Sequence, residues 1–459
     1  MAERETWTTR LGFILAAVGS AVGLGNIWGF PFQAGRNGGA AFLIVYLVVV
    51  LLIGLPAMLS EFVVGRRGRK NPIDAIAELG HREWSFAGGI GAFAAFWILA
   101  FYSVVGGWVI RYVYGTATGA YFGSTGAGEY FMSIAMGWDA VALHALFLLL
   151  TFGIVAFGIE HGIERATKLM VPSIVVLLLG IGIWASTLSN AGVGYEFYLA
   201  PDLGELTANL GSIIPYAVGQ AFFTLSLGMG AMITYASYLG EDDSLPADGS
   251  IIVVLNTFVG VLAGFVVFPV LFHFDPQIDL AGAGGAGTAF TTLGAAFAGL
   301  GTSGRVLGFV FFLVLLLAAL SSSISLLEVV TAYLIENSNY SRVQVAGTLA
   351  GVIFLFGVPS ATGIFGMDGL TTLTWYNDIA YNLILPISVL ALSIFVGWVV
   401  GHDSLDEIRQ GSTVSRAFDV TWLWFVRLVI PGAVLFTLVL GIQSLLILGG
   451  VIQQPFFLG

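Results

Sequence analysis

The chain has 459 residues, of which 58% are hydrophobic and 9% are charged, and its mean hydropathy is +0.95. Soluble domains carry about 25% charged residues, so this composition excludes an ordinary soluble protein. The net charge is −11 and no basic stripe is present, which excludes a nucleic-acid-binding protein. Because the chain has no cysteine, disulfides, thiol catalysis and thiolate metal sites are excluded as well.

Apolar runs separated by polar clusters predict an all-α polytopic membrane protein, with eleven transmembrane helices in a single domain over residues 1–459. Each crossing of a bilayer needs about 20 apolar residues. The predicted spans are residues 11–35, 40–64, 86–115, 140–157, 168–187, 212–238, 250–272, 304–335, 343–358, 371–399 and 418–450.

Arginine and lysine gather in alternate connections, including Arg66, Arg67 and Lys70 after the second span, and Arg165 and Lys168 beside the fifth. The opposite loops, 188–210 and 273–303, carry almost no cations. The positive-inside rule then predicts a multi-pass protein of the cell membrane with a cytoplasmic N-terminus. Since the number of spans is odd, the C-terminus is expected outside. Gly, Asn and Pro interrupt the first span, so we do not expect it to be a cleaved signal peptide.

Two spans contain residues that do not sustain a helix. They are the run AVGLGNIWGFP at 21–31 and the run TLSLGMG at 224–230. Glycine costs about 1 kcal/mol in a helix relative to alanine, and hydroxyl groups compete for backbone hydrogen bonds. Unwound backbone at this depth is tolerated only where it lines a cavity. The sequence therefore predicts that helices 1 and 6 are discontinuous and that a binding site lies between them.

The two interrupted spans are five spans apart, which is typical of inverted repeats with a site at their junction. The first repeat would cover residues 11–187 (helices 1–5) and the second residues 212–399 (helices 6–10). Residues 418–450 would then form an additional helix 11.

A broken helix exposes N–H groups at one new end and C=O groups at the other, so it can hold a carboxylate and a cation. Neutral oxygens occur nearby in Asn26, Thr224, Asn256 and the serine run 321–325. Such oxygens suit a hard monovalent cation, for which sodium is the simplest choice. The serines alone have a second interpretation, since membrane serines usually bond to their own helix.

Enzymatic chemistry finds no support, because the sequence has no HExxH motif, no GxSxG motif and no pair of intramembrane carboxylates. Glu61 is the acidic residue that lies well inside an apolar run. It is either a functional carboxylate or a structural acceptor for the backbone of an unwound helix.

Six segments carry a resemblance to a known family: RETWTTRLGFILAAVGSAVGLGNIWGFP (4–31), NGGAAFLIVY (37–46), GLPAMLSEFVVGR (54–66), GIERATKLMVP (within 158–172), VGQAFFTLSLGMGAMITYASY (218–238) and LAALSSSIS (317–325). Over nearly its whole length the chain resembles the neurotransmitter:sodium symporter family, particularly its prokaryotic amino-acid transporters. The resemblance implies a five-plus-five inverted-repeat fold and a sodium-coupled symporter that imports an apolar α-amino acid by alternating access. The alternative is a receptor-like or ion-conducting member that binds an amino acid without coupled uptake.

The resemblance also implies positions for ions and substrate. The first sodium would lie among Ala21, Asn26, Thr224, Asn256 and the substrate carboxylate. The second would lie among Gly19, Val22, Ala318, Ser321 and Ser322. The substrate site would be formed by Ser20, Ala21, Leu24, Gly25, Ile98, Tyr102, Phe223, Thr224, Ser226, Met229, Ser322 and Leu326.

Gly23 decides the expected substrate class. Monoamine transporters of the family have an aspartate there, so in this chain the substrate must bring its own carboxylate. Ile98, Phe223, Met229 and Leu326 favour an apolar side chain on the amino acid. Which amino acid is bound, and the oligomeric state, are left open.

The gates differ from those of relatives. The charged outer pair is replaced by Gly29 and Thr374, and a joint loss avoids leaving one unpaired charge. Phe223 is expected to form the outer lid. The inner gate would consist of Arg4, Trp7, Ser237, Tyr238 and Glu336.

The sequence leaves two alternatives for the negative charge that balances sodium, and one of them is chloride. Tyr46, Gln220, Thr224 and Asn256 match a chloride-binding pattern, whereas Gly260 supplies neither the acid nor the serine found in relatives. Sodium at low dielectric favours a nearby negative charge. Either chloride supplies it, or the substrate carboxylate alone suffices.

Overall fold

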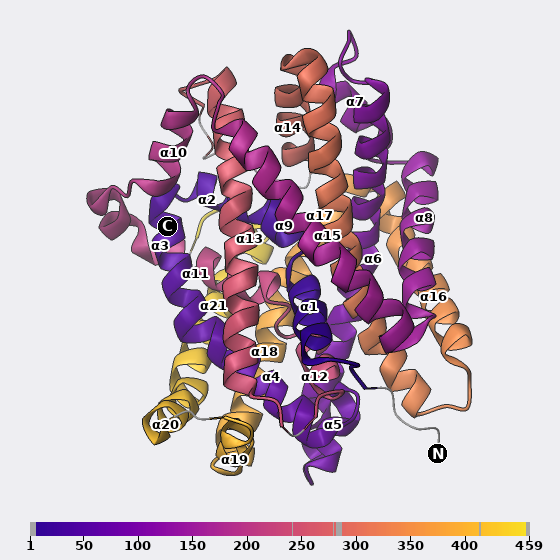
Figure 1. The fold of residues 1–459 in the computed structure, drawn as a ribbon, viewed down its shortest axis with the longest axis vertical. Coiled ribbons are helices and arrows are strands. Elements are labelled where there is room, and N and C mark those ends of the chain that lie inside the picture. The colour runs from indigo at the N-terminus through magenta and orange to yellow at the C-terminus, as the bar shows by residue number, and fades with distance from the viewer. Residues whose placement is uncertain (1–5, 241, 279, 281–286, 413–414, 456–459) are drawn as a thin grey trace.

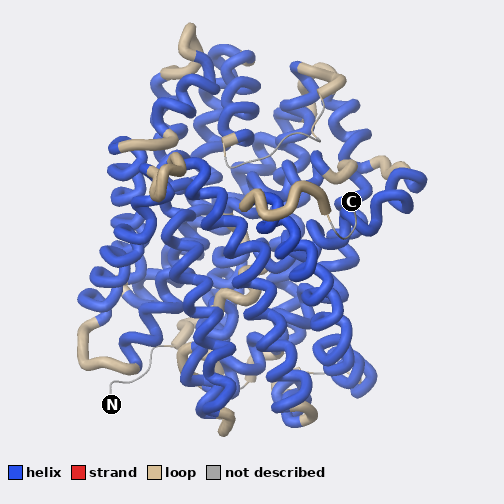
Figure 2. Tube along the Cα trace, turned by 180° about the vertical axis from the view of Figure 1, so that it is seen from behind, coloured by secondary structure: helices blue, strands red, loops and turns tan. Residues whose placement is uncertain are grey.

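The computed structural model describes residues 6–240, 242–278, 280, 287–412 and 415–455. Within these residues the chain is helical, and its β-structure is limited to an isolated bridge between Ile364 and Met367. The long helices run roughly along the longest axis of the molecule (Figure 1), and mostly short loops join them (Figure 2). The predicted all-α membrane architecture is confirmed.

The helices of the first half are α1 (Arg10–Ala21), η1 (Gly25–Gly29), α2 (Phe30–Arg36), α3 (Ala40–Val49), η2 (Val50–Gly54), α4 (Leu55–Gly68), α5 (Pro72–Glu78), η3 (Arg82–Trp84), α6 (Ser85–Thr118), α7 (Gly126–Ile134), α8 (Trp138–Val155), η4 (Ile159–Glu164), α9 (Arg165–Ala185), α10 (Ala191–Leu199) and α11 (Leu203–Thr224). Those of the second half are α12 (Ala231–Ala236), α13 (Leu245–Phe274), α14 (Thr288–Gly299), α15 (Gly301–Glu336), α16 (Arg342–Thr362), α17 (Gly369–Ile379), η5 (Ala380–Ile384), α18 (Leu385–Ile394), η6 (Phe395–Val400), α19 (Asp403–Arg409), α20 (Arg416–Trp424), η7 (Phe425–Val429) and α21 (Ile430–Leu448).

In the described part of the chain, nine helices are long and apolar enough to cross a membrane, or ten if the bent pair Arg10–Ala21 and Gly25–Arg36 is one span. The predicted count of eleven is not reached by this criterion, because the sixth span is broken and its apolar part, Ile213–Thr224, is short. The expected loops 188–210 and 273–303 also contain helices, namely α10, the start of α11, and α14.

The first span breaks where the glycines cluster. The Thr9 hydroxyl caps α1 by accepting a hydrogen bond from the Gly12 N–H. The helix ends at Val22, whose backbone is extended (φ −79°, ψ 96°). Beyond it, η1 and α2 continue at an angle of 52° to α1. The predicted interruption of helix 1 is therefore confirmed.

The second break separates α11, which ends at Thr224, from α12, which begins at Ala231. Gly228 and Gly230 have φ of +75° and +70°, which glycine adopts without steric cost. Ser226 also has a positive φ, +54°, and such a conformation costs a residue with a side chain about 1–2 kcal/mol. This local strain coincides with the predicted binding site, as is common at functional sites.

The breaks lie in the centre of the bundle. Helix α1 packs against α9, α12, α13 and α15, while α6 and α15 form the most extensive helix pair. In Figure 1, α1 lies in the middle of the molecule with α12 and α5 below it. The unwound segments are thus covered by packed helices on all sides.

Candidate functional site

A small cavity lies where the two broken helices meet. Its volume is about 20 Å³, room for about one water molecule. Every predicted substrate residue lines it except Thr224, and Gly23 joins them. An amino acid would therefore require the walls to move apart, which the sequence did not indicate. The lining residues are Ser20, Ala21, Gly23, Leu24, Gly25, Ile98, Tyr102, Phe223, Ser226, Met229, Ser322 and Leu326.

Hydrogen-bond donors converge at the outer end of this cavity. The Leu24 N–H donates to the Tyr102 hydroxyl at 3.2 Å, and the Gly23 N–H donates to Asn26 Oδ1 at 3.2 Å. A Cβ atom on Gly23 would lie 2.3 Å from Ser322 Oγ and 3.0 Å from the Tyr102 hydroxyl. Glycine at 23 therefore leaves only backbone beside these two side chains, and a carboxylate could approach the N–H groups closely.

Oxygen atoms of the proposed first sodium site lie close together. In one orientation of the Asn256 amide, its Oδ1 lies 3.0 Å from the Thr224 carbonyl oxygen and 3.2 Å from that of Ala21. The same Oδ1 accepts a hydrogen bond from Asn26 Nδ2 at 2.8 Å. Turning the amide around would place its NH₂ group against both carbonyls instead. The Thr224 and Ala21 carbonyl oxygens therefore face either the NH₂ group of Asn256 or, if its Oδ1 is turned to them, a cation between the three oxygens.

The residues of the proposed second sodium site also meet. The Ser321 hydroxyl donates to the carbonyls of Val22 (3.2 Å) and Ala318 (3.0 Å). A Cβ atom on Gly19 would lie 3.4 Å from Ser321 Cβ, so the Gly19 backbone is adjacent. The Ser322 hydroxyl donates to the Ser20 carbonyl at 2.9 Å. The Ser321 hydroxyl and the Val22 and Ala318 carbonyls thus meet at one buried position, whereas the Ser322 hydroxyl is turned to the Ser20 carbonyl.

Serines that the sequence analysis named separately form one network that joins both broken helices to α15. The Ser20 hydroxyl donates to Ser325 Oγ at 2.8 Å, and the Ser226 hydroxyl donates to the Ser20 carbonyl at 2.9 Å. Ser226 is the residue with strained backbone, so this bond holds the unwound segment of the sixth span against α1. The run SSSIS was the available signal for Ser325.

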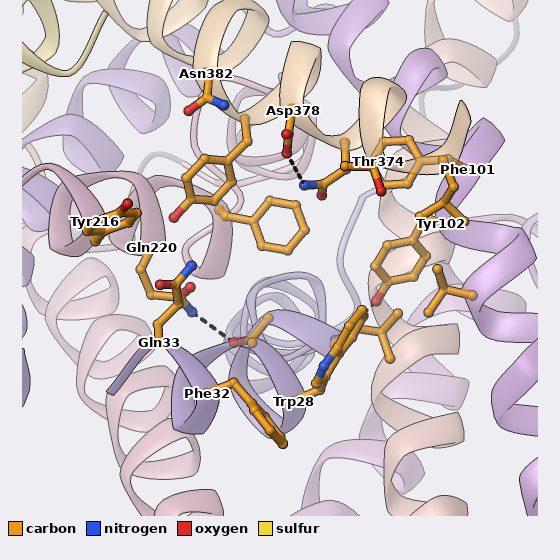
Figure 3. Close-up of a pocket in the computed structure, with 18 of the residues that line it drawn as sticks. Trp28, Phe32, Gln33, Phe101, Tyr102, Tyr216, Gln220, Thr374, Asp378 and Asn382 are labelled. Carbon is orange, nitrogen blue, oxygen red and sulfur yellow. Dashed lines mark hydrogen bonds between the residues drawn. The ribbon is translucent and has the colours of Figure 1, made fainter. Parts of the chain in front are cut away.

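A second, larger cavity of about 400 Å³ adjoins the first (Figure 3). Leu24, Gly25, Tyr102 and Phe223 line both cavities, so they form the partition between them. The Phe223 ring also lies 6.0 Å from that of Tyr381. This position agrees with the expectation that Phe223 acts as a lid.

The larger cavity, here called the vestibule, is lined by charged side chains, although the two residues predicted for the outer gate, Gly29 and Thr374, are uncharged. Both of these residues line it, but so do Arg36 and Asp378. Asp378 accepts a hydrogen bond from Asn377 Nδ2 at 3.0 Å, one helical turn beyond Thr374 (Figure 3). In the described part of the chain, Arg36 and Asp378 do not form an ion pair.

Aromatic residues of the predicted inner gate pack against one another. Trp7 Nε1 donates to the Tyr235 carbonyl at 2.9 Å, and its ring lies 6.0 Å from that of Tyr238. Ser237 is buried beside them. The Tyr238 hydroxyl in turn donates to Glu328 at 3.0 Å, a partner that the sequence analysis did not include.

The rest of the predicted inner gate is only partly visible. Glu336 accepts hydrogen bonds from the backbone and side chain of Asn71, at 2.9 and 2.6 Å. Arg4, its predicted partner, lies outside the described residues. The pairing of these two residues therefore stays a prediction.

Glu61 and the predicted chloride residues lie beside the breaks. Glu61 Oε1 accepts a hydrogen bond from the Gly228 N–H at 2.7 Å. Of the two interpretations of this carboxylate, the bond agrees with a structural acceptor for the backbone of an unwound helix. Gln220 Nε2 donates to the Gly25 carbonyl at 2.8 Å (Figure 3). Tyr46 is buried, with its ring 4.8 Å from that of Phe30. The Glu61 and Gln220 bonds hold unwound or π-helical backbone in place, while Tyr46 packs against Phe30 of α2.

The chain was compared with known proteins. A family model described as "Sodium:neurotransmitter symporter family" matches residues 4–123 and 135–448. The uncharacterised sodium-dependent transporter YhdH of Bacillus subtilis is 37% identical over 95% of this chain and 98% of its own length. The sodium-dependent neutral amino acid transporter SLC6A17 of Mus musculus is 30% identical over 59% of this chain and 41% of its own length.

A solved structure is similar in fold as well as in sequence. The crystal structure of MhsT in complex with L-phenylalanine matches with a TM-score of 0.85 and 38% identity. The match covers 95% of this chain and 99% of MhsT.

Proposed function

This chain belongs to the sodium:neurotransmitter symporter family and is a sodium-dependent, multi-pass membrane transporter rather than an enzyme, and on this premise we propose that it imports an apolar α-amino acid together with sodium. Uptake would proceed by alternating access, with the small cavity open first to the vestibule and then to the cytoplasm. The MhsT complex contains L-phenylalanine, which supports an amino acid as the small-molecule substrate.

The observation that carries this proposal is the composition of the small cavity. Its outer end presents the Leu24 N–H and the Tyr102 hydroxyl, which suit a carboxylate. Its remaining wall includes Ile98, Met229 and Leu326, which suit an apolar side chain. Since Gly23 supplies no acidic side chain, the carboxylate would have to come from the substrate.

Two sodium sites are part of the proposal. The convergence of Asn256 Oδ1 with the Ala21 and Thr224 carbonyls supports the first site. The Ser321 hydroxyl between the Val22 and Ala318 carbonyls supports the second. Each site would join α1 to another helix, so bound sodium would favour the conformation in which these helices are together. A ligand that binds one conformation more tightly shifts the population towards it.

We further propose that the two breaks mark two inverted repeats, residues 11–187 and 212–399, with the site at their junction. The interruptions at 22–24 and 225–230 support this division, because they occupy the same place in the first span of each half. The expected cytoplasmic N-terminus rests on the distribution of arginine and lysine.

The test is uptake of a panel of labelled L-amino acids into proteoliposomes with an imposed sodium gradient. We expect at least one apolar amino acid to accumulate with inward sodium and not when choline replaces sodium. Binding without sodium-driven accumulation would favour the receptor-like alternative, and a sodium current without accumulation would favour the ion-conducting one.

A further inference from the structure

Arg427 lies between two tryptophan rings on the outer surface of the bundle. Its guanidinium carbon is 5.3 Å from the centre of the Trp398 ring and 5.4 Å from that of the Trp424 ring. Both distances are typical of cation–π contacts. The two rings are 56% and 49% exposed, so the charged group lies at the surface and not inside the core.

The guanidinium is held in a defined orientation. Arg427 Nε donates to the Gly397 carbonyl at 2.7 Å. A Cβ atom on Gly397 would lie 3.1 Å from Arg427 Cγ, so the glycine allows the arginine to pass close to the backbone. Both residues belong to π-helical turns, η6 and η7, which frequently mark functional sites.

Two carboxylates near this end of the molecule are paired with other arginines. Glu407 pairs with Arg66, and Asp419 pairs with Arg409. Within the described residues, Arg427 has no carboxylate partner, and Gly397 is its side chain's hydrogen-bond acceptor. Its terminal N–H groups are therefore available to an anion from outside the protein.

The position of Arg427 along its helix fixes its depth in the bilayer. Residues 428–448 carry no charge, and at 1.5 Å per residue they extend over about 30 Å. This length equals the thickness of the hydrocarbon core. Leu428, Leu435 and Val439 are exposed on this helix, as expected where it faces lipid. Arg427 is therefore at the boundary between hydrocarbon and headgroups.

The neighbouring helix gives the same boundary. Residues 379–401 are uncharged, and Trp398 lies near their end. Tryptophan is enriched at membrane interfaces. Arg66 and Arg409 lie at this same end of the molecule, which is the cytoplasmic end by the positive-inside rule.

We propose that Arg427, Trp398 and Trp424 bind the phosphate of an anionic phospholipid in the cytoplasmic leaflet. A guanidinium can donate two parallel hydrogen bonds to phosphate oxygens, and the indole rings would cover the adjoining glycerol and acyl chain. Long arginine side chains near the ends of membrane helices extend to the interface, where a lipid phosphate would be within reach of the terminal N–H groups of Arg427. The site is separate from both cavities and does not depend on the transported substrate.

The test is native mass spectrometry of the full-length protein, titrated with phosphatidylglycerol or phosphatidylcholine. We expect at least one phosphatidylglycerol to bind preferentially, and Arg427→Gln to weaken this binding by about ten-fold. Arg427→Lys keeps the charge but loses the planar fork, so an intermediate loss is expected. Arg416→Gln is the matched control, because Arg416 is an exposed arginine of the same helix without tryptophan contacts, and it should bind lipid as the unaltered protein does.

A second variant and a second measurement distinguish loss of the lipid site from poor folding of Arg427→Gln. Trp424→Leu leaves the Arg427–Gly397 bond in place, and it should reduce the rise in thermal stability that phosphatidylglycerol produces. Equal lipid binding by Arg427→Gln and the unaltered protein would overturn the proposal. So would a loss in Arg416→Gln as large as that in Arg427→Gln. Equal stabilisation by inorganic phosphate alone would also overturn it, because the source would then be a free ion.

Discussion

The Leu24 N–H donates a hydrogen bond of 3.2 Å to the hydroxyl of Tyr102, at the partition between the small cavity and the vestibule. This bond joins the unwound backbone of the first span to the middle of α6. An incoming carboxylate would compete for both groups, since each can donate a hydrogen bond to it. Binding of substrate is thereby expected to replace a bond that holds the partition closed.

Tyr102→Phe removes one of these donors without changing the ring. Hydrogen bonds to charged groups contribute about 1.5–3 kcal/mol, so we expect the KM for the amino acid to rise by about ten-fold or more. Initial rates of uptake in proteoliposomes measure this effect. Tyr198→Phe is the control, because the Tyr198 hydroxyl makes a hydrogen bond of the same length, 3.2 Å, to the Val261 carbonyl and lies away from both cavities. Similar KM values for the two variants would contradict the assignment.

Phe223→Ala should open the partition, since Phe223 lines both cavities. We expect labelled substrate to dissociate at least ten-fold faster from the purified variant. High salt should leave this rate unchanged, because no ion pair joins the described charges of the vestibule and there is little to screen. Phe101→Ala, which changes only the vestibule wall, is the control and should retain substrate. Strong acceleration by salt would instead point to a charged outer gate.

The sequence predicted the breaks in helices 1 and 6 correctly because glycine and hydroxyl residues act locally on the backbone. The same local argument could not give the volume of the cavity, which depends on how Ile98, Tyr102, Phe223 and Ser322 pack across three separate spans. It also left the role of Glu61 open. The bond from Gly228 to Glu61 joins residues 167 positions apart, so only the folded chain could reveal it.

Other differences arise from reading apolar runs as simple crossings. Residues 191–199 were expected in a loop, but their glycine, valine and aromatic residues form α10 against α13. In the vestibule, the sequence analysis named Gly29 and Thr374 but not Asp378, which lies one turn further along α17. Helix register in a polar stretch has no strong apolar pattern to fix it, and an aligned position there can shift by a turn.

Gly23→Ala should weaken binding, since the new Cβ atom would lie 2.3 Å from Ser322 Oγ and 3.0 Å from the Tyr102 hydroxyl, and both side chains would have to shift. Gly23→Asp would cause the same crowding, so it does not isolate the effect of charge. The requirement for a substrate carboxylate is better tested with the amide of the transported amino acid. We expect the amide to compete at least 30-fold more weakly, because it cannot serve as an anionic ligand of sodium. Equal competition would show that no carboxylate is required. Gly89→Ala, with no atom within 4 Å of the new Cβ, controls for glycine substitution.

Thr224→Val tests the first sodium site. The Thr224 hydroxyl is paired with the Asn256 amide at 3.2 Å, and valine keeps the shape while removing the oxygen. We expect the sodium concentration for half-maximal uptake to rise several-fold, because the ion loses a ligand or the amide loses its orientation. Thr437→Val removes a buried hydroxyl from α21 and should leave the sodium dependence unaltered. An unchanged sodium dependence in Thr224→Val would remove this residue from the site.

The final prediction concerns chloride. Gln220 Nε2 donates to the carbonyl of Gly25, the residue before Asn26 of the first sodium site. Gly260, whose Cβ atom would lie 3.7 Å from Asn26 Nδ2, carries no side chain that could supply a charge. The substrate carboxylate can neutralise sodium only while substrate is bound. We therefore expect sodium-driven uptake to be faster in chloride than in gluconate medium, because an anion near Tyr46 would offset the buried cation.

Gly260→Glu is the variant that separates this prediction from its alternative. A Cβ atom at 260 would lie 3.5 Å from Phe30 Cγ and 3.7 Å from Asn26 Nδ2, which are ordinary contact distances. A glutamate can therefore begin there without displacing its neighbours and can place a fixed negative charge towards Asn26. We expect the variant to transport equally in both media, while Gly260→Gln, of matched size but neutral, keeps the chloride dependence. Identical rates of the unaltered protein in chloride and gluconate would mean that the substrate carboxylate alone balances the sodium.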